Sequence, residues 1–338
     1  MCFGIKEFLE WVPIGGTGKG VDVSLRLPDR WVWDSWYIWD GDVCHAFYLT
    51  ASRGLGDPIR RHRNPSVGHA ISKDLKNWEI LPDALTPSDS PAFDSWTTWT
   101  GSTIKGPDGN WWMFYTGTSR EDGGDVQSIG LATSPDLMTW TKHSTKPLVT
   151  ADETWYELLD KTIWHDQAWR DPWVFKLDDS GPWHMLITAR ANHGDPKTRG
   201  VVGHAISTDL LSWEVQPPLS EPGQGFGQLE VFQYEVVDGV PTVLFCCGYR
   251  ELSVERLAQH GQEDGVFSFT CNSDLTGMDV SKSTQFPDTS IYAARLVKDK
   301  SGWNLLGFKN IIDGEFVGEI SDPIPVTSVP GIGLVPRS

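Results

Sequence analysis

The sequence predicts an all-β protein: a five-bladed β-propeller that forms a single domain without a C-terminal β-sandwich. Three observations predict this fold. Apolar, aromatic-rich segments recur five times, and a shorter turn motif recurs in step with them. Hardly any stretch carries the i, i+3, i+4 apolar pattern of an amphipathic helix, so helix is expected to be scarce.

The five aromatic-rich segments are expected to be equivalent strands. Their starts, at residues 44, 111, 183, 242 and 303, lie 59 to 72 residues apart. Each interval has room for about four strands, which is the size of one propeller blade. In chain order the segments read CHAFYLTA (44–51), WWMFYTGT (111–118), WHMLITAR (183–190), TVLFCCGY (242–249) and WNLLGFK (303–309).

The turn motif follows the first three of these strands. It reads GHAISKDLKNW at 68–78, GLATSPDLMTW at 130–140 and GHAISTDLLSW at 203–213, and a worn fourth copy is expected at 269–275. Each copy predicts a short strand, a turn with Asp at its centre and a Trp that begins the next strand. A β-sandwich with coincidental internal similarity is the alternative, and the repeat favours the propeller.

The propeller is expected to occupy residues 29–325. Residues 1–28 would form an N-terminal segment, and residues 326–338 a C-terminal tail. The last five residues, LVPRS, resemble part of a protease-site linker, so part of this tail is expected to come from an expression vector.

The net charge of −17 argues against nucleic acid or an anionic membrane as a partner, because phosphate groups would be repelled. A neutral substrate fits better, and the sequence leaves the oligomeric state open. No run of eighteen apolar residues predicts a membrane span. The first residues, MCFGIKEFLEWVP, are too acidic for a signal peptide, so we expect a cytoplasmic protein, or a secreted one if a leader has been removed.

The five cysteines are an odd number without CxxC spacing, so buried free thiols are expected rather than disulfides or a zinc site. No metal or other cofactor is predicted. The eighteen tryptophans are abnormal; they fit a β-rich core, and also a site where indole rings cover the apolar face of a sugar.

Three carboxylates are candidate catalytic residues because they stand at matching places in three repeats. The innermost strand of each blade lines the propeller axis, and that strand should run about ten residues before each aromatic segment. Asp34 lies ten residues before residue 44, while Asp171 and Glu230 each lie twelve residues before the next segment. In the other two repeats this place holds Ser102 and the stretch from Tyr292 to Arg295.

Carboxylates flanked by Trp, Pro, Leu or Val are costly to bury unless they are paired or used, so we expect one shared acidic pocket. Glycosidic bond cleavage needs such a group of acids. Glu230, between Leu229 and Val231, is expected to have a raised pKa and to act as the acid. Asp34 is the candidate nucleophile. The adjacent Arg170 should keep Asp171 ionised and suit it to binding sugar hydroxyls.

At these residues the chain resembles the invertase–levansucrase clan, glycoside hydrolase families 32 and 68. Trp33-Asp34-Ser35-Trp36 is similar to the segment that carries the levansucrase nucleophile, and the segment from Trp99 to Ser102 resembles one that lines the fructosyl subsite. Arg170-Asp171-Pro172 matches the RDP motif, and Glu230 falls where the clan has its acid/base. The resemblance, which spans residues 30–310, makes Trp33, Trp36, Trp99, Ser102, Arg170, Arg250, Tyr292 and Arg295 candidate substrate-binding residues.

The resemblance implies a retaining glycoside hydrolase or fructosyltransferase that acts on β-fructofuranosyl linkages in sucrose, levan, inulin or related oligosaccharides. Asp34 would form a fructosyl-enzyme, which water or another sugar would release. The family 32 nucleophile motif N-D-P-N is absent, and Glu230 lacks the Cys or Arg that usually follows the acid/base, which leaves the acceptor side open.

Two other readings of the site remain. A family 43-like arabinofuranosidase or arabinanase would use three carboxylates on the same fold with inversion of configuration, and a propeller could also bind sugar without catalysis.

The basic run Arg60-Arg61-His62-Arg63 is expected to be a solvated loop, with phosphorylated-sugar binding at the pocket rim as its alternative. Asp40 and Asp42 are expected in a hairpin turn rather than in the site.

Overall fold

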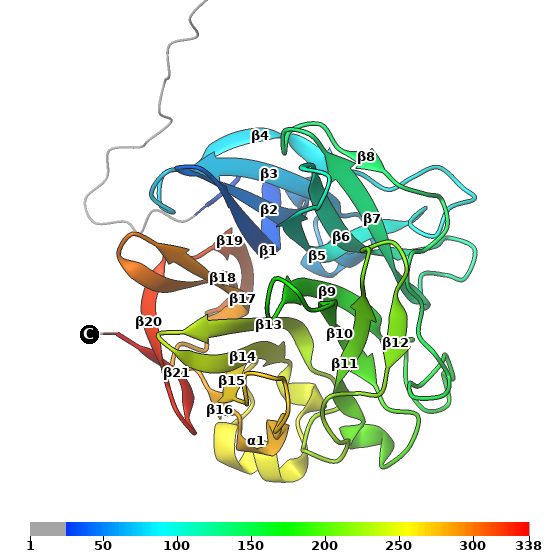
Figure 1. Ribbon diagram of the computed structural model, residues 1–338, viewed down its shortest axis with the longest axis vertical. Coiled ribbons are helices and arrows are strands. Elements are labelled where there is room, and N and C mark those ends of the chain that lie inside the picture. The colour runs from blue at the N-terminus through cyan, green and yellow to red at the C-terminus, as the bar shows by residue number, and fades with distance from the viewer. Residues whose placement is uncertain (1–24, 338) are drawn as a thin grey trace, which may run out of the picture.

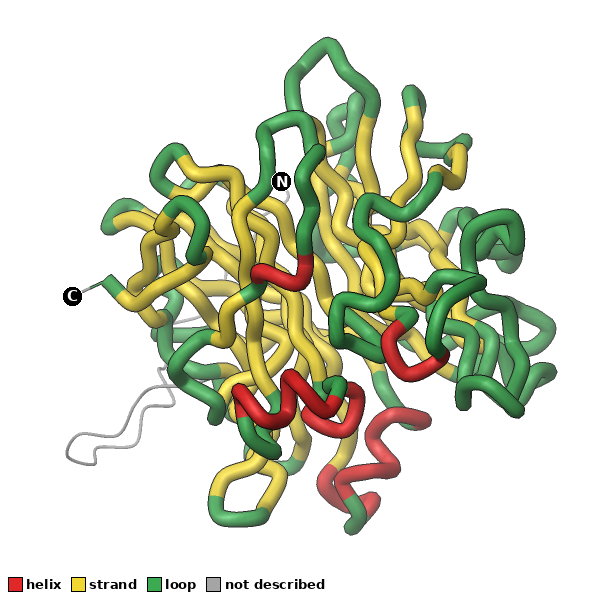
Figure 2. Tube along the Cα trace, turned by 90° about the horizontal axis from the view of Figure 1, so that it is seen from below, coloured by secondary structure: helices red, strands yellow, loops and turns green. Residues whose placement is uncertain are grey.

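In a computed structural model the described residues, 25–337, form five antiparallel sheets arranged in a ring around a central axis (Figure 1). This arrangement confirms the predicted five-bladed propeller. Strands and loops make up nearly the whole trace, and the helical segments are short (Figure 2). Within the described range, no helix is both long enough and apolar enough to cross a membrane.

Each blade contains at least four strands, and throughout the first four blades consecutive strands in the chain are neighbours in the sheet. The strands are β1 (Arg30–Asp40), β2 (Val43–Ser52), β3 (Ser66–Ser72) and β4 (Glu79–Leu85) in blade 1; β5 (Thr97–Lys105), β6 (Trp111–Thr118), β7 (Gln127–Ser134) and β8 (Thr141–Lys142) in blade 2; β9 (Trp169–Lys176), β10 (Trp183–Arg190), β11 (Gly200–Ser207) and β12 (Glu214–Gln216) in blade 3; β13 (Glu230–Val237), β14 (Val240–Cys247), β15 (Gly265–Thr270) and β16 (Thr284–Gln285) in blade 4; and β17 (Ile291–Asp299), β18 (Gly302–Ile312), β19 (Glu315–Ile320), β20 (Ile324–Val329) and β21 (Gly333–Pro336) in blade 5.

The helical segments lie in the connections between strands. They are the 3₁₀ helices η1 (Arg53–Leu55), η2 (Pro58–Arg63), η3 (Pro196–Thr198), η4 (Tyr249–Glu251) and η5 (Val280–Lys282), and the α-helix α1 (Val254–His260).

The first strand of every blade, β1, β5, β9, β13 or β17, lies nearest the axis (Figure 1). The predicted aromatic-rich segments form the second strands, which are almost completely buried because they pack between neighbouring blades. Side chains on the first strands are therefore the ones that can meet at the centre.

The predicted turn motif has one conformation in all of its copies. In the first copy the Asp74 carboxylate accepts hydrogen bonds from the backbone N–H groups of Lys76 and Asn77, at 2.9 and 2.8 Å. The following Leu75 has a positive φ of 62° and is completely buried. The matching leucines of the other copies, including the worn fourth one, have φ values of 64–67°: Leu137, Leu210 and Leu275. Burial of the leucine offsets the strain of its left-handed backbone.

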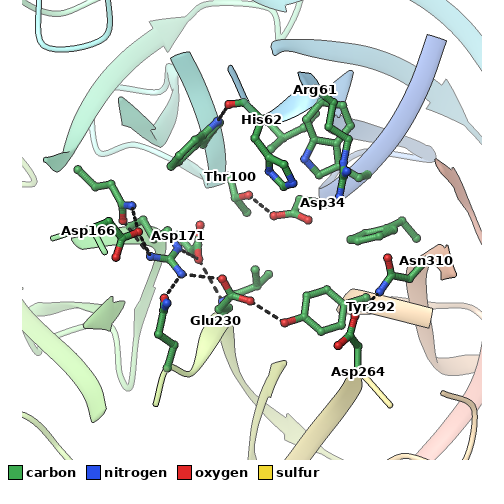
Figure 3. Close-up of a pocket in the computed structure, with 18 of the residues that line it drawn as sticks. Asp34, Arg61, His62, Thr100, Asp166, Asp171, Glu230, Asp264, Tyr292 and Asn310 are labelled. Atoms are coloured by element: carbon green, nitrogen blue, oxygen red, sulfur yellow. Dashed lines mark hydrogen bonds and ion pairs between the residues drawn. The ribbon is translucent and has the colours of Figure 1, made fainter. Parts of the chain in front are cut away.

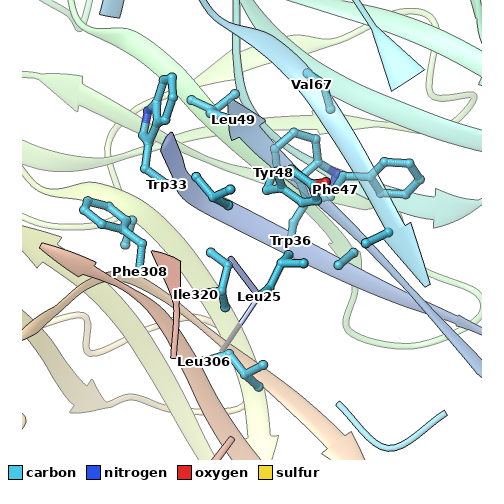
Figure 4. Packing of buried hydrophobic residues seen from close by; sticks show 14 of the residues in the cluster. Leu25, Trp33, Trp36, Phe47, Tyr48, Leu49, Val67, Leu306, Phe308 and Ile320 are labelled. Carbon is cyan, nitrogen blue, oxygen red and sulfur yellow. The ribbon is translucent and has the colours of Figure 1, made fainter. Parts of the chain in front are cut away.

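The largest hydrophobic cluster packs blade 1 against blades 2 and 5, and its contact with blade 5 closes the ring (Figure 4). Trp36 and Phe47 of blade 1 stack with ring centroids 6.0 Å apart, and Leu306 and Phe308 enter the same cluster from blade 5. Just before β1, the Leu25 carbonyl accepts a hydrogen bond from the Ile320 N–H at 3.1 Å, so the two ends of the propeller meet here.

The structure corrects the predicted C-terminal boundary. β20 pairs with β18, and β21 pairs with β20, so blade 5 continues well beyond residue 325. Leu334, assigned to a linker, is only 3% exposed and lies in the hydrophobic core. At the other end, residues 1–24 of the predicted N-terminal segment, with Cys2, lie outside the described residues. The four described cysteines are free thiols, three of them buried.

Candidate functional site

A cavity of about 310 Å³ lies at one end of the propeller axis, and residues from all five blades line it. Asp34, Asp171 and Glu230 lie around it and face a common space (Figure 3). The three carboxylates therefore meet, although Asp171 follows Asp34 by 137 positions and Glu230 follows Asp171 by 59.

A break in strand register shapes this cavity. Each first strand loses its pairing register for one or two residues at the same level, as in a β-bulge: at Asp34, at Thr100, at Asp171-Pro172, at Val231-Phe232 and at Ala293-Ala294. Bulges re-aim the side chains next to them. Asp171, Val231 and Ala293 adopt positive φ there, at 59°, 58° and 43°.

The bulges define two tiers of residues around the axis. The last paired residues before the five bulges make up the first tier, and all of them line the cavity: Trp33, Trp99, Arg170, Glu230 and Tyr292. The first residue of each bulge belongs to the second tier. Four of these residues line the cavity, namely Asp34, Thr100, Asp171 and Val231, whereas the fifth, Ala293, does not.

The tiers correct one geometric expectation. Asp34 and Asp171 occupy the same place in their blades, but Glu230 belongs to the other tier, one residue earlier. In blade 2 the place of Asp34 is taken by Thr100 and not by Ser102. Counting back from the aromatic strands missed this difference because the distance to the bulge varies between blades.

Asp34 is a partly buried carboxylate on β1. Its Oδ2 accepts a hydrogen bond from the Thr100 hydroxyl at 2.5 Å. Burial and the neighbouring charges of Asp171 and Glu230 raise its pKa to about 7, although the Thr100 bond and Arg61 oppose this rise. Asp34 therefore changes its protonation state near neutral pH.

Asp171 is more deeply buried, and side chains of its own blade and of blade 2 hold it in place. Its Oδ2 accepts a hydrogen bond from the Thr188 hydroxyl at 2.9 Å, and its own N–H donates to the Thr116 Oγ1 at 2.9 Å. Burial raises the pKa of Asp171 to about 6, while Arg170 opposes the rise. Arg170 lies 3.5 Å from this carboxylate, so it favours ionisation of Asp171 as expected without restoring an ordinary pKa.

Glu230 is held at both oxygens. Its Oε1 pairs with the Arg170 Nη2 at 2.6 Å, and its Oε2 accepts a hydrogen bond from the Tyr292 hydroxyl at 2.6 Å. Its chain neighbours are apolar as the sequence indicated, yet the carboxylate itself meets a guanidinium and a phenol. Arg170, Glu230 and Tyr292 thus link blades 3, 4 and 5 within one tier, and this fixes the direction of the Glu230 carboxylate.

Four of the eight predicted substrate-binding residues line the cavity: Trp33, Trp99, Arg170 and Tyr292. The other four do not line it. Trp36 is completely buried in the core, where its Nε1 donates to Thr103. The Ser102 hydroxyl accepts the Val174 N–H behind the cavity wall.

The remaining two are arginines. Arg295 is 1% exposed and donates to the backbone carbonyls of Val231 and Phe232, with its guanidinium over the Trp173 ring. Arg250 is exposed in η4 and turns toward the Tyr249 hydroxyl. One position along a strand decides whether a side chain faces the axis or the core, and the motifs alone do not show which.

Several cavity residues were not predicted. Thr100 lies inside the WTGS segment and would have been found by placing the bulge. Arg61 and His62 belong to the basic run expected to be solvated, whereas both line the cavity. No sequence signal marked the others, which come from loops and strand ends: Gln127, His165, Asp166, Gln228, Glu251, Asp264 and Asn310.

Among the described residues no group of three or more His, Cys, Asp or Glu side chains is arranged to hold a metal ion. The cavity offers the chemistry of its acids. One carboxylate can attack or stabilise a cationic carbon while a second transfers a proton, and aromatic rings of Trp33 and Trp99 provide apolar walls for a sugar.

Comparison with known proteins agrees with this arrangement. The family model for the glycosyl hydrolases family 32 N-terminal domain matches residues 37–314. The beta-fructofuranosidase insoluble isoenzyme CWINV2 of Arabidopsis thaliana is 32% identical over 177 residues, which cover 51% of this chain and 26% of that protein. The chain thus matches only about a quarter of the length of this relative.

Two solved structures share the fold. The kestose-bound inulosucrase from Halalkalicoccus jeotgali superposes with a TM-score of 0.71 at 20% identity, covering 93% of this chain and 91% of the other. The levansucrase of Bacillus subtilis gives a TM-score of 0.71 at 14% identity, covering 97% and 90%. Both matches extend over nearly the whole propeller.

Proposed function

The chain belongs to glycosyl hydrolase family 32, and from this membership we propose that it cleaves or transfers β-fructofuranosyl groups of neutral sugars such as sucrose, kestose, inulin or levan. The curated relatives that it matches are named beta-fructofuranosidases, and two structures of the same fold are an inulosucrase and a levansucrase. A carbohydrate is the proposed partner.

The observation that carries this proposal is the meeting of Asp34, Asp171 and Glu230 in one cavity with two indole rings. Burying a group of like charges costs free energy, so such a group is expected where a reaction needs it. Here two of the three acids have raised pKa values, which is typical of active sites. The volume, about 310 Å³, suits a small ligand or the end of a longer one.

In the proposed first step, a carboxylate oxygen of Asp34 attacks the anomeric carbon of the fructosyl group. The bond from that carbon to the leaving sugar breaks, and Glu230 gives a proton to the departing oxygen. The product is a fructosyl ester on Asp34, and configuration is inverted once.

In the second step Glu230, now a carboxylate, takes a proton from water or from a sugar hydroxyl. That oxygen attacks the anomeric carbon and releases Asp34, which restores the original configuration. Arg170 and Tyr292 keep the Glu230 carboxylate directed at the reacting oxygen in both steps. Asp171, fixed by Thr188 and Thr116, would accept hydrogen bonds from fructosyl hydroxyls.

The test is incubation of the purified protein with sucrose, 1-kestose, inulin, levan and an aryl arabinofuranoside, following released sugars by chromatography. We expect fructose release or transfer from the fructosides. Asp34→Ala should lower kcat by ~10³-fold or more because it removes the nucleophile. Asp42→Ala is the matched control, since this exposed carboxylate lies at the outer end of the β1–β2 hairpin and should leave kcat unchanged.

Two further measurements decide the mechanism. NMR at early times should show the first-released fructose as the β-anomer, and mass spectrometry after rapid quenching should find a fructosyl adduct on the peptide that contains Asp34. Activity on the arabinoside alone would replace the proposed function with that of an arabinofuranosidase. Binding of fructosides without turnover would indicate a sugar-binding propeller.

A further inference from the structure

We propose that Arg61 is a positioning residue for Asp34. Its guanidinium, fixed at the cavity wall by η2, keeps the Asp34 carboxylate available for attack and stabilises the negative charge that returns to it when the fructosyl ester breaks. This inference rests on the proposed role of Asp34 as nucleophile.

The three arginines of the basic run point in different directions. Arg60 is exposed and donates to the Leu55 carbonyl at 3.1 Å within its own loop. Arg63 donates to the Gly124 carbonyl at 2.7 Å and lies 3.7 Å from Asp125. Arg61 alone among the three is buried, at 8% exposure, and lines the cavity.

The surrounding residues fix the position of the Arg61 side chain. Asp57 caps η2 by accepting the Ile59 N–H at 2.9 Å, and the Arg61 Nη1 donates to the Pro58 carbonyl at 2.9 Å. The guanidinium lies 3.8 Å from the centre of the Phe316 ring and 5.6 Å from that of Trp33. Such a cation–π arrangement orients a guanidinium without neutralising its charge.

No carboxylate of the described residues forms a direct ion pair with Arg61, and its buried Nε has no hydrogen-bond acceptor there. A buried polar group without a partner is unusual and points to a ligand or to a charge across a small gap. Asp34 lines the same cavity on the side of Arg61 (Figure 3). Its charge raises the pKa of Arg61, although burial lowers that pKa to about 10 overall, so Arg61 is a cation at neutral pH.

The other cations near Asp34 are already engaged. Arg170 is paired with Glu230, and Arg295 is bonded to two backbone carbonyls. His62 has an exposed side chain at the cavity, and desolvation there and the adjacent arginines lower its pKa, so its imidazole is neutral at neutral pH. The groups that face Asp34 and bear on its charge are the carboxylates of Asp171 and Glu230, the Thr100 hydroxyl, the Cys246 thiol and the guanidinium groups of Arg61 and Arg295.

The charge of the cavity excludes a phosphate group as the natural partner of Arg61. Six carboxylates line the same space: Asp34, Asp166, Asp171, Glu230, Glu251 and Asp264. An anionic sugar would have to approach all of them, whereas the basic run supplies the cavity with only one guanidinium. The arrangement therefore fits a cation that serves an internal carboxylate.

The reaction needs such a cation at two moments. Asp34 must lack a proton to attack, and it regains a full negative charge when the ester bond breaks in the second step. An opposite charge at about 4–6 Å lowers a carboxyl pKa by roughly one to three pH units. Without Arg61, more of the protein would carry a protonated and unreactive Asp34 at pH 6.

The test compares Arg61→Gln and Arg61→Lys with Arg60→Gln, a matched control on the same helix whose guanidinium is exposed. For each variant, kcat/KM on sucrose or 1-kestose is measured from pH 4.5 to 9. We expect the acidic limb of Arg61→Gln to move to higher pH by up to about one unit. Arg61→Lys should restore most of the wild-type profile, and Arg60→Gln should match wild type.

The opposite results are equally clear. An unchanged acidic limb with a raised KM in Arg61→Gln would overturn the inference and make Arg61 a sugar-binding residue. If wild type releases no fructose, the proposed function fails, and the electrostatic inference is tested by NMR titration of ¹³C-aspartate-labelled protein. Asp34, assigned with Asp34→Asn, should then titrate at higher pH in Arg61→Gln; titration at the same pH in both proteins would reject it.

Discussion

At the scale of single residues, the cavity brings carboxylates close together, and this lowers the stability of the folded protein. Asp34 and Asp171 sit at bulged positions where burial and nearby carboxylates, above all Asp171 for Asp34 and Glu230 for Asp171, raise their pKa values to about 7 and 6. Such groups lower the free energy of unfolding at neutral pH. This cost is typical of positions kept for function rather than for stability.

The first prediction concerns Asp34 and the pH dependence of stability. Its pKa is about 7 in the folded state and 3.8 in the unfolded reference. The folded state therefore binds this proton more tightly, and the stability that the proton contributes is present below pH 4 and is lost as the pH rises through 7. The amide of Asp34→Asn cannot ionise, so the variant keeps this stability at high pH. We therefore expect its free energy of unfolding, relative to that of wild type, to rise by roughly 1–3 kcal/mol between pH 4.5 and pH 8.

Urea unfolding at both pH values measures this gain. The control is Asp42→Asn, which removes an exposed carboxylate and should give the same difference from wild type at either pH. Parallel pH dependences for Asp34→Asn and wild type would show that Asp34 has an ordinary pKa.

At the scale of the strand, the five bulges decide which side chains reach the axis. Regular pairing would alternate cavity-facing and core-facing residues along each first strand. The bulge adds residues without a partner, so two successive residues such as Trp33 and Asp34, or Arg170 and Asp171, can both line the cavity. The acids and the groups that hold them are thereby brought to neighbouring positions.

A second prediction tests how the blade 3 bulge is held. The Thr116 Oγ1 of β6 accepts the Asp171 N–H at 2.9 Å and donates to the Thr100 carbonyl at 3.1 Å. Thr116→Val leaves that buried N–H without its acceptor, so we expect a loss of about 1–3 kcal/mol in the free energy of unfolding. Misplacement of Asp171 should also lower kcat/KM by about tenfold or more.

Thr118→Val is the matched control on the same strand. Thr118 is also completely buried, and its hydroxyl bonds to that of Thr97 at 2.7 Å, outside the cavity lining. It should lose similar stability while kcat/KM stays at the wild-type value. Equal losses of activity in the two variants would mean that the bulge is not held by Thr116.

At the scale of the whole molecule, the cavity exists only because the ring of blades is closed. The closure joins blade 1 to blade 5 through the packing in Figure 4, the Leu25–Ile320 hydrogen bond and Arg53. The Arg53 Nη2 donates to the Val317 carbonyl of blade 5 at 2.9 Å, and its Nε donates to the Arg30 carbonyl of blade 1 at 3.1 Å. Trp33 and Tyr292 of the cavity belong to these same two blades.

The third prediction in this group concerns that closure. Arg53→Ala removes both hydrogen bonds and the cation–π contact with Trp31, in which the guanidinium lies 5.7 Å from the ring centre. We expect it to lower the free energy of unfolding by roughly 1–3 kcal/mol in urea titrations. Arg60→Ala, which loses only one bond within an exposed loop, should change it by less than about 0.5 kcal/mol. Equal effects would mean that Arg53 does not contribute to closing the ring.

The sequence by itself determined the architecture and the three acids. A propeller repeats one supersecondary unit. Short sequence segments therefore predict its period, its buried second strands and its Asp-Leu turns without an alignment. The RDP tripeptide, the WDSW segment and Glu230 stand on first strands, and first strands must line the axis. Asp34, Asp171 and Glu230 could therefore be placed in one cavity before any coordinates were known.

Only the tertiary structure decided which neighbours join them. A shift of one residue moves a side chain between cavity and core, and the bulges that set this register leave no mark in the sequence. Trp36, Ser102 and Arg295 therefore lie behind the wall, while Thr100 lies in it. Arg61 lies in a connection between strands. Its side chain is directed into the cavity by packing against Phe316, a residue distant in the sequence.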